Sequence, residues 1–239
     1  MISRSDFSRF QVITFDCYGT LIDWETGILT TVRKVLSTHQ AEMHDLEILR
    51  LYSEFEAEAE AEAEAESGEF VPYREVLCRV VRDFASRVGF SPTQDEQQSL
   101  PNSVADWAPF PDTVQALHRL KTKFKLGIIS NVDDELFSAT ARRLQVNFDY
   151  VITAGQARAY KPSMAIFKLA QSRMEIAAEN WLHAGQSIFH DVIPAKSLGM
   201  STVWVNRPSI RAGSGAAKQA SAEPDFEVKT LNELADTLA

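Results

Sequence analysis

The stretch VITFDCYGTLID, residues 12–23, places an acidic residue directly after a run of β-branched and aromatic side chains. Residues 12–15 predict a buried strand, so Asp16 falls where that strand ends. Gly19 permits a tight backbone turn there, and Thr20 can donate a hydrogen bond to the acid or to a bound anion. A carboxylate in this place can act as a nucleophile whose ester water later cleaves, or it can cap the turn.

Strand-like runs recur along the chain and alternate with helical patterns, which predicts an α/β fold with a parallel sheet covered on both faces. The predicted strands are Phe10–Phe15, Lys125–Ser130, Tyr150–Ala154, Trp181–Ala184, Ser201–Asn206 and Phe226–Val228. The predicted helices between them are Thr113–Lys123, Glu135–Leu144, Met164–Met174 and Ile193–Leu198. In such sheets the active site lies at the carboxyl ends of the strands, where Asp16 stands.

The long segment between the first and second predicted strands has a helical pattern throughout. Its predicted helices are Thr26–Ser37, Leu46–Glu66 and Tyr73–Val88. The proline-rich WAPFP at residues 107–111 marks the return to the sheet. We therefore expect a core made of residues 1–22 and 109–239, and a helical cap over the active site made of residues 23–108.

A glutamate–alanine repeat, EFEAEAEAEAEAES, spans Glu54 to Ser67. Strict alternation nominally suggests a strand, but alanine and glutamate are strong helix formers and poor strand formers. The glutamates of such a helix spread around most of its surface, so we expect little of it to be buried. The prediction is a solvated helix extension that ends at Ser67-Gly68; a calcium site or a cationic partner is the alternative.

The bulk composition limits the classes of function. The chain has 239 residues, 45% of them hydrophobic, and a formal net charge of −9. An acidic chain without a basic cluster argues against a nucleic acid or an anionic membrane as partner. Cys17 and Cys78 show no metal-binding spacing and fit a reducing compartment. The N-terminus lacks the apolar region of a secretory signal and no apolar run approaches a membrane span, so a cytoplasmic location is expected.

Three further segments carry candidate chemistry at predicted strand ends or in the loops beside them. Ser130 and Asn131 end a predicted strand, where a hydroxyl and backbone N–H groups can hold a substrate carboxylate or phosphate. Lys161 precedes a proline in an extended loop and can pair with Asp16 to hold it ionised. Asp191 follows another strand and either enters the same cleft or caps a helix.

His190, beside this acid, is a candidate general base, although a structural role is the more common one for a histidine in such a place.

These segments, in this order, resemble the haloacid dehalogenase (HAD) superfamily over nearly the whole chain. The resemblance rests on Asp16-x-Tyr-Gly-Thr-Leu, Ser130-Asn131, Lys161-Pro162 and the late Asp191. It implies a Rossmann-like α/β core with an α-helical cap inserted after the first strand. It also implies that Asp16 is the nucleophile. The implied groups around it are Thr20, Ser130, Asn131, Lys161 and Asp191.

Two departures from the common pattern of this superfamily point to a particular reaction. Most members are magnesium-dependent phosphatases with Asp-x-Asp in the first motif and a second acid in the last. Here Tyr18 stands at the general-acid position and Gln186 replaces an acid of the last motif. Mg²⁺ prefers hard oxygen ligands, largely carboxylates, so the metal site is diminished. Lys161 also competes for the same negative charge.

The form Asp-x-Tyr-Gly-Thr instead resembles the L-2-haloacid dehalogenases, which need no metal or other cofactor. The resemblance implies that Asp16 attacks the halogen-bearing carbon, halide leaves without an acid, and water cleaves the ester. Lys161 orients Asp16, and Asp191 helps the hydrolytic water. Ser130, Asn131 and nearby N–H groups bind the carboxylate of a small 2-haloacid, while a neutral Tyr18 does not repel it.

The cap side of the site is less defined by the resemblance. Arg50 is the nearest counterpart of an arginine that receives halide, with Ser53 an equally good alignment. Aromatic walls of the pocket, or alternatively core residues, are Trp24, Tyr52, Phe55 and Trp107.

Residues 23–28 and the ending Ser187-x-x-His190-Asp191 resemble a side branch with fluoroacetate dehalogenases and an azetidine-2-carboxylate hydrolase. A C–N ring-opening hydrolase, a Mg²⁺-dependent phosphatase and a non-enzymatic binding protein are therefore the alternatives. A homodimer is common among the resembled enzymes.

Overall fold

Six parallel strands form one sheet in the computed structural model, which describes residues 4–65, 70–212 and 215–239. The strand order is β3-β2-β1-β4-β5-β6, and every neighbouring pair is parallel. The strands are β1 (Val12–Phe15), β2 (Lys125–Ser130), β3 (Tyr150–Thr153), β4 (Trp181–Gly185), β5 (Ser201–Val205) and β6 (Phe226–Val228). The predicted α/β core with a parallel sheet is confirmed, and each predicted strand is present.

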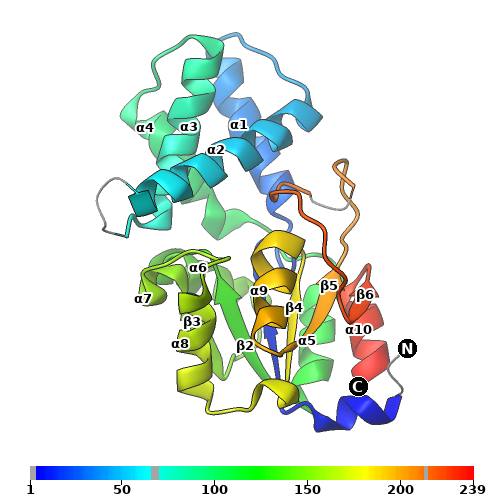
Figure 1. Cartoon of the computed structure of the whole chain (residues 1–239). Coiled ribbons are helices and arrows are strands. Elements are labelled where there is room, and N and C mark those ends of the chain that lie inside the picture. The colour runs from blue at the N-terminus through cyan, green and yellow to red at the C-terminus, as the bar shows by residue number, and fades with distance from the viewer. Residues whose placement is uncertain (1–3, 66–69, 213–214) are drawn as a thin grey trace.

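Helices cover both faces of this sheet (Figure 1). They are α5 (Thr113–Lys121), α6 (Asp134–Leu144), α8 (Met164–Met174), α9 (Ile193–Ser197) and α10 (Leu231–Leu238). Successive side chains of a strand point to opposite faces of the sheet, so β1 contributes side chains to two apolar clusters. Ile13 and Phe15 pack in the cluster that contains α5, α6 and α10, and Val12 packs in the cluster of α8 and α9. Short helical turns complete the core: η1 (Arg4–Arg9), α7 (Ala154–Ala157), η3 (Ala178–Asn180) and η4 (Ile188–Val192).

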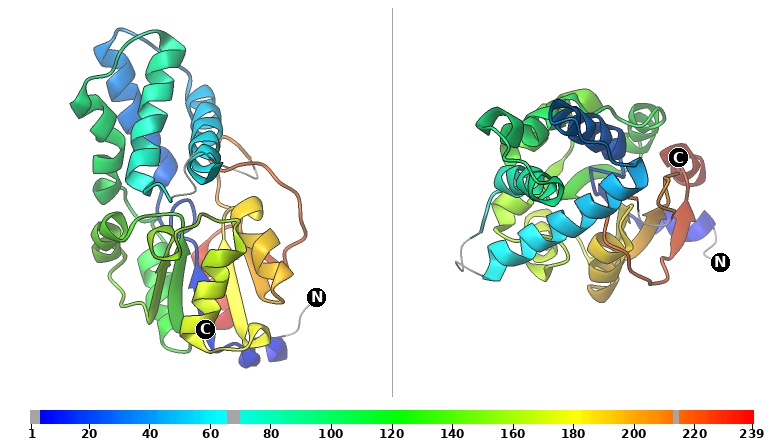
Figure 2. Two further views of the ribbon diagram at one scale, coloured as in Figure 1. Left: turned by 60° about the vertical axis from the view of Figure 1, so that its left-hand side comes forward. Right: turned by 90° about the horizontal axis from the view of Figure 1, so that it is seen from above.

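Four helices stand above the carboxyl ends of the strands and form the cap (Figures 1 and 2). They are α1 (Trp24–Thr38), α2 (Asp45–Ala65), α3 (Tyr73–Val88) and α4 (Gln94–Ser103), followed by the turn η2 (Val104–Asp106). The fourth helix is absent from the sequence prediction because its sequence, QDEQQSLPNS, is polar and lacks an apolar period. Its start is nevertheless encoded by a capping box between Thr93 and Glu96.

The chain passes between core and cap at two adjacent points. Ile22 and Pro109 form an isolated antiparallel bridge. The amide of Asp23 donates to the carbonyl of Ala108 at 2.8 Å. The two segments that join cap and core are hydrogen-bonded to each other, so the backbone groups of each satisfy those of the other.

A segment after β5 connects the core to the cap a second time (Figure 1). The hydroxyl of Ser209 donates to both carboxylate oxygens of Glu25 in α1, each at 2.8 Å. The guanidinium of Arg211 donates to the carbonyl of Leu49 in α2 at 2.9 Å. These contacts fix the first two cap helices relative to the sheet.

The glutamate–alanine repeat differs from its prediction. It is helical to Ala65, but Glu56, Ala59 and Glu60 are buried, whereas Glu54 and Glu58 are exposed. Residues four apart share a helix face, so every second glutamate of this part faces the core. The expectation that little of the repeat is buried is therefore wrong for this part, because α2 lies across the top of the sheet (Figure 2). The predicted end at Ser67-Gly68 lies outside the described residues.

Among the described helices, none combines the length and the apolar character that crossing a membrane requires.

Asp112 is expected to be a strong stability determinant of the core. Its Oδ1 pairs with the buried Arg207 at 2.7 Å, and its Oδ2 accepts the amides of Leu231 and Asn232 at the start of α10. Asp112→Ala leaves a buried guanidinium unpaired, so the free energy of unfolding should fall by about 3 kcal/mol. Urea denaturation measures it. Asp106→Ala is the control, because that carboxylate is 84% exposed, and it should change stability by less than about 0.5 kcal/mol.

Candidate active site

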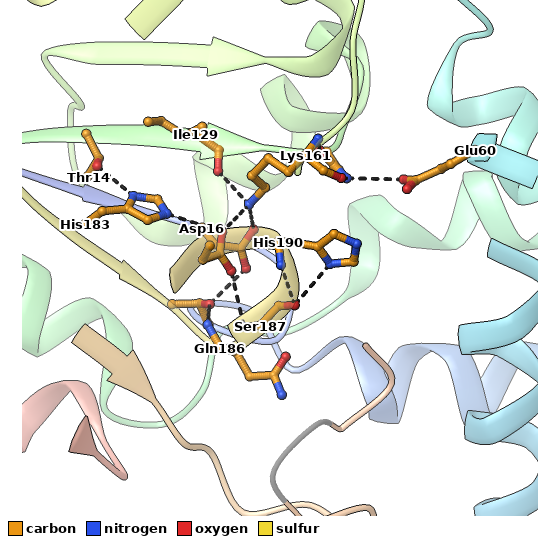
Figure 3. Close-up of polar contacts among 12 residues, drawn as sticks. Thr14, Asp16, Glu60, Ile129, Lys161, His183, Gln186, Ser187 and His190 are labelled. Carbon is orange, nitrogen blue, oxygen red and sulfur yellow. Dashed lines mark hydrogen bonds and ion pairs between the residues drawn. The ribbon is translucent and has the colours of Figure 1, made fainter. Parts of the chain in front are cut away.

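Asp16 lies at the carboxyl end of β1 and is held from both sides (Figure 3). Its amide donates to the carbonyl of Ala184, which fixes the backbone against β4. Thr20 donates its hydroxyl to Oδ2 at 2.8 Å, and Lys161 donates to Oδ1 at 2.8 Å. Gly19 adopts φ 87°, which lets the turn bring Thr20 back to the acid. The orientation of the carboxylate is thereby set before any substrate binds.

The ammonium of Lys161 is 2% exposed and uses each of its three N–H groups. They donate to Asp16 at 2.8 Å, to Asp191 at 2.6 Å and to the carbonyl of Ile129 at 3.0 Å. Asn131 clamps the backbone of the lysine: its Oδ1 accepts the Lys161 amide at 2.6 Å, and its Nδ2 donates to the Lys161 carbonyl at 3.1 Å. Asn131 therefore positions Lys161.

Asp191 stands in the π-helical turn that follows β4. Besides Lys161, its carboxylate accepts the amide of Ser187 at 3.2 Å and contacts His183 Nε2 at 3.2 Å. His183 Nδ1 lies 2.8 Å from Thr14 Oγ1. The Thr14 oxygen accepts the indole N–H of Trp181 at 2.7 Å, so its own proton is free for His183. This arrangement favours the tautomer in which His183 Nε2–H donates to Asp191.

Burial and charge determine the protonation states. Burial raises the pKa of Asp16, although the ammonium of Lys161 opposes this effect. Burial also acts to raise the pKa of Asp191, but Lys161 and His183 outweigh it and hold that pKa well below its ordinary value. The two carboxylates raise the pKa of Lys161 against the opposing effect of burial. Burial lowers the pKa of His190 to about 4, so this imidazole is neutral at pH 7.

A pocket lies above these groups, between core and cap. Its core side is lined by Asp16, Tyr18, Ser130, Asn131, Lys161, Gln186, Ser187, His190 and Asp191. Its cap side is lined by Trp24, Glu56, Glu60 and Tyr73. The structure therefore brings the predicted residues Asp16, Tyr18, Trp24, Ser130, Asn131, Lys161 and Asp191 to one cavity, with Thr20 bonded to Asp16 beneath it.

Arg50 does not join this group. Its guanidinium is 46% exposed and pairs with Glu54, one turn along α2, at 2.6 Å. It lines a different groove, with Arg33 and Ile210. The reason is the rotation of α2: its buried face carries Tyr52 and Glu56, and Arg50 lies on another side of the helix. The predicted halide contact by Arg50 is therefore wrong. Ser53, the alternative, is buried but does not line the pocket.

The aromatic candidates divide between pocket and core. Trp24 lines the pocket and packs edge-on against Tyr52, with ring centroids 5.7 Å apart. Tyr18 contributes its ring, which meets Trp107 edge-on at 5.7 Å. Its hydroxyl bonds Thr140 Oγ1 at 2.9 Å and is thereby engaged away from the Asp16 carboxylate. Phe55 and Trp107 pack in the core and do not line the pocket.

The hydroxyl of Ser130 is buried and has no hydrogen-bond partner within the described ranges. Buried polar groups in native proteins are nearly always paired, so an unpaired one at a pocket calls for an explanation. Ser130 ends β2 and lines the pocket. A bound polar ligand would supply the missing partner.

Sequence reasoning missed four functional positions. Glu56, Glu60 and Tyr73 line the pocket from the cap, and Glu60 accepts Asn131 Nδ2 at 3.3 Å (Figure 3). Tyr52, Glu56 and Glu60 are spaced four residues apart, and this spacing indicates that they share one face of the helix. His183 was missed because it lies inside a strand predicted to be buried. A single ionisable residue in an apolar strand was the signal there.

The donor set does not suit a resident Mg²⁺ ion. Searched over residues 4–65, 70–212 and 215–239, the chain shows no group of three or more His, Cys, Asp or Glu side chains that could hold a metal. Asp16 and Asp191 share the ammonium of Lys161, and the amide of Gln186 takes the place of another acid. A divalent cation would have to displace that ammonium or lie against it.

The fold and this site define an α/β protein with an inserted helical cap and a buried, hydrogen-bonded aspartate at the end of β1. A family model for haloacid dehalogenase-like hydrolases matches residues 10–199, and the chain belongs to this family. It is 27% identical to an (S)-2-haloacid dehalogenase of Pseudomonas fluorescens over 233 residues, 96% of this chain and 97% of that protein.

Solved structures show the same fold. A defluorinating L-2-haloacid dehalogenase superposes with a TM-score of 0.81 at 21% identity, covering 96% of this chain and 95% of its own. L-2-haloacid dehalogenase from Xanthobacter autotrophicus with chloropropionic acid covalently bound gives a TM-score of 0.78 at 21% identity, covering 95% and 97%.

Gly185 is expected to be essential for the placement of Asp191. A Cβ at residue 185 would lie 2.3 Å from Asp191 Cγ, so Gly185→Ala must displace the carboxylate that Lys161 binds. We expect the free energy of unfolding to fall by about 1–3 kcal/mol, as for other overpacked cores. Gly155→Ala is the matched control, because its Cβ would meet nothing closer than 3.6 Å. Equal stability of the two variants in urea denaturation would contradict this geometry.

Proposed function

We propose that this hydrolase displaces halide from a small 2-haloacid through an Asp16 ester, without a metal ion. The observation that carries the proposal is an oriented, buried carboxylate beneath a pocket between core and cap. Thr20 and Lys161 hold it, while the position two residues on is a tyrosine whose hydroxyl bonds Thr140. The likeness to haloacid dehalogenases along 96% of the chain supports it.

In the first step, Asp16 attacks the halogen-bearing carbon. An oxygen–carbon bond forms, the carbon–halogen bond breaks, and the electron pair leaves with the halide. Lys161 orients the buried nucleophile and favours its ionised form, which partly opposes the desolvation that raises the pKa of Asp16. Halide is stable as an anion, so Tyr18 need not supply a proton.

In the second step, water attacks the carbonyl carbon of the Asp16 ester. The hydroxy acid leaves and the carboxylate forms again, carrying one oxygen from water. Asp191 is the proposed helper of this water, positioned by Ser187 and His183. Lys161 remains between the two acids and stabilises the carboxylate as it returns.

The carboxylate of the substrate would be received by the unpaired hydroxyl of Ser130 and by N–H groups at the strand ends. Trp24 lines the pocket from the cap side and would limit the access of water to the displacement. We place the activity in the cytoplasm, because both cysteines are free and buried. We also propose that the protein forms a homodimer.

A C–N ring-opening hydrolase that uses the same nucleophile is the second candidate. The observation that favours it is the pair of buried glutamates, Glu56 and Glu60, at the pocket. A substrate that carries a cationic nitrogen would favour the ionised form of these acids and would be attracted by it.

Halide release measures the leading proposal directly. The purified chain in EDTA should release halide from L-2-chloropropionate, and p-nitrophenyl phosphate with Mg²⁺ should not be turned over. Phosphate release without halide release would establish the phosphatase alternative instead. Asp16→Asn should reduce halide release by more than about 1,000-fold, because the nucleophile is lost. The exposed Asp236→Asn should retain full activity.

A single turnover in H₂¹⁸O, with enzyme in excess, tests the ester. The product hydroxyl should carry ordinary oxygen, because it comes from Asp16, and the heavy oxygen should appear in Asp16 itself. Mass spectrometry of the product and of the peptide around Asp16 measures both. Heavy oxygen in the product of the first turnover would mean that water attacks the substrate directly.

A further inference from the structure

Glu56 is a buried acid at the pocket for which the mechanism above has no use. It lies on the face of α2 that crosses above the sheet, and it lines the same pocket as Asp16. Glu58, two residues further along the same helix, is exposed. Helix α2 thus presents Glu56 to the pocket and Glu58 to solvent.

The carboxyl group of Glu56 is held through one oxygen. Tyr52 donates its hydroxyl to Oε1 at 3.0 Å, and Tyr73 donates to the same oxygen. The two hydroxyls lie 3.1 Å apart. In the described part of the chain no hydrogen bond reaches Oε2. A proton on Glu56 therefore belongs on Oε2, because Oε1 already accepts two hydrogen bonds, and Oε2 is the atom left for a bound molecule.

The direction of the reaction identifies what this atom would meet. In a displacement at carbon, the leaving group departs opposite the attacking oxygen. Asp16 attacks from the core, so the halide departs towards the cap. The cap side chains that line the pocket are Trp24, Glu56, Glu60 and Tyr73. They include no lysine, arginine or histidine among the residues described, and Arg50 faces another groove.

We propose that Glu56, in its protonated form, is the catalytic residue that receives the leaving group by donating a hydrogen bond from Oε2. This inference rests on the proposed dehalogenation. Asp16 forms the bond to carbon, the carbon–halogen bond breaks, and the departing halide accepts the hydrogen bond while the proton stays on Glu56. A poorer leaving group depends more on this bond, because more negative charge must be stabilised as it departs.

The surroundings of Glu56 make the protonated form available. Burial raises its pKa to about 7, with the hydroxyls of Tyr73 and Tyr52 opposing and the charge of Asp16 adding to the rise. The other titratable groups of the pocket are Glu60 on the same helix and Tyr18, Lys161, His190 and Asp191 from the core. An incoming substrate carboxylate would favour the neutral acid further.

The expected pH dependence follows from the raised pKa of Glu56. Below about pH 7 Glu56 is protonated and can donate; above it the ionised acid repels the departing halide. The kcat/KM for L-2-chloropropionate should therefore fall as pH rises through about 7. Glu56→Gln keeps an N–H donor without a titrating proton and should lose this alkaline decline. Glu58→Gln, on the exposed side of the same helix, should keep it.

Leaving-group dependence separates catalysis from a structural role. Glu56→Ala removes the donor and should lower kcat for L-2-chloropropionate by about 100-fold. The loss with L-2-bromopropionate should be about tenfold smaller, because bromide needs less assistance. Unchanged thermal unfolding of Glu56→Gln confirms that the fold is retained in that conservative variant.

The outcomes distinguish the two proposals. Equal losses with both halides, or an alkaline decline that persists in Glu56→Gln, overturn the role of Glu56 and leave the dehalogenation standing. A wild-type protein that releases neither halide overturns both. The role of Glu56 is established if Glu56→Ala loses more kcat with L-2-chloropropionate than with L-2-bromopropionate and if Glu56→Gln loses the alkaline decline.

Discussion

The buried ammonium of Lys161 organises the active site. It lies between Asp16 and Asp191, and it also bonds the carbonyl of Ile129 at the end of β2. Removing an ammonium and two carboxylates from water is costly unless they are paired and hydrogen-bonded. The three groups come from β1, from the loop ahead of α8 and from the turn after β4, so this pairing ties three chain segments to one point.

The chemistry of the site follows from its charge balance. One ammonium faces two carboxylates, and the positions that would complete a magnesium site are the neutral Tyr18 and Gln186. In the proposed reaction Asp16 is therefore the nucleophile beside an ammonium rather than beside a metal ion. The proposed substrate class suits this balance, because halide leaves as an anion that a hydrogen-bond donor can stabilise. A phosphoryl group would instead require stronger positive charge.

The cap forms one wall of the pocket. It supplies the aromatic wall of Trp24 and the acids Glu56 and Glu60 from one face of α2. Its position depends on contacts far apart in the sequence, among them Ser209 with Glu25 and Arg211 with the carbonyl of Leu49. The proposed leaving-group contact thus depends on the packing of the cap against a segment that follows β5.

The sequence by itself determined the sheet and the helical nature of the insertion, because strand and helix periodicity are local features. It placed Asp16 and Ser130 at strand ends, and the resemblance to a family grouped them with Lys161 and Asp191. Only the tertiary structure decided which face of α2 meets the pocket. The rotation of that helix, set by packing, turns Arg50 away and Glu56 inward. The tertiary structure also revealed α4, whose polar sequence lacks an apolar period, and His183, whose contact with Asp191 arises from the fold of β4 and the turn after it.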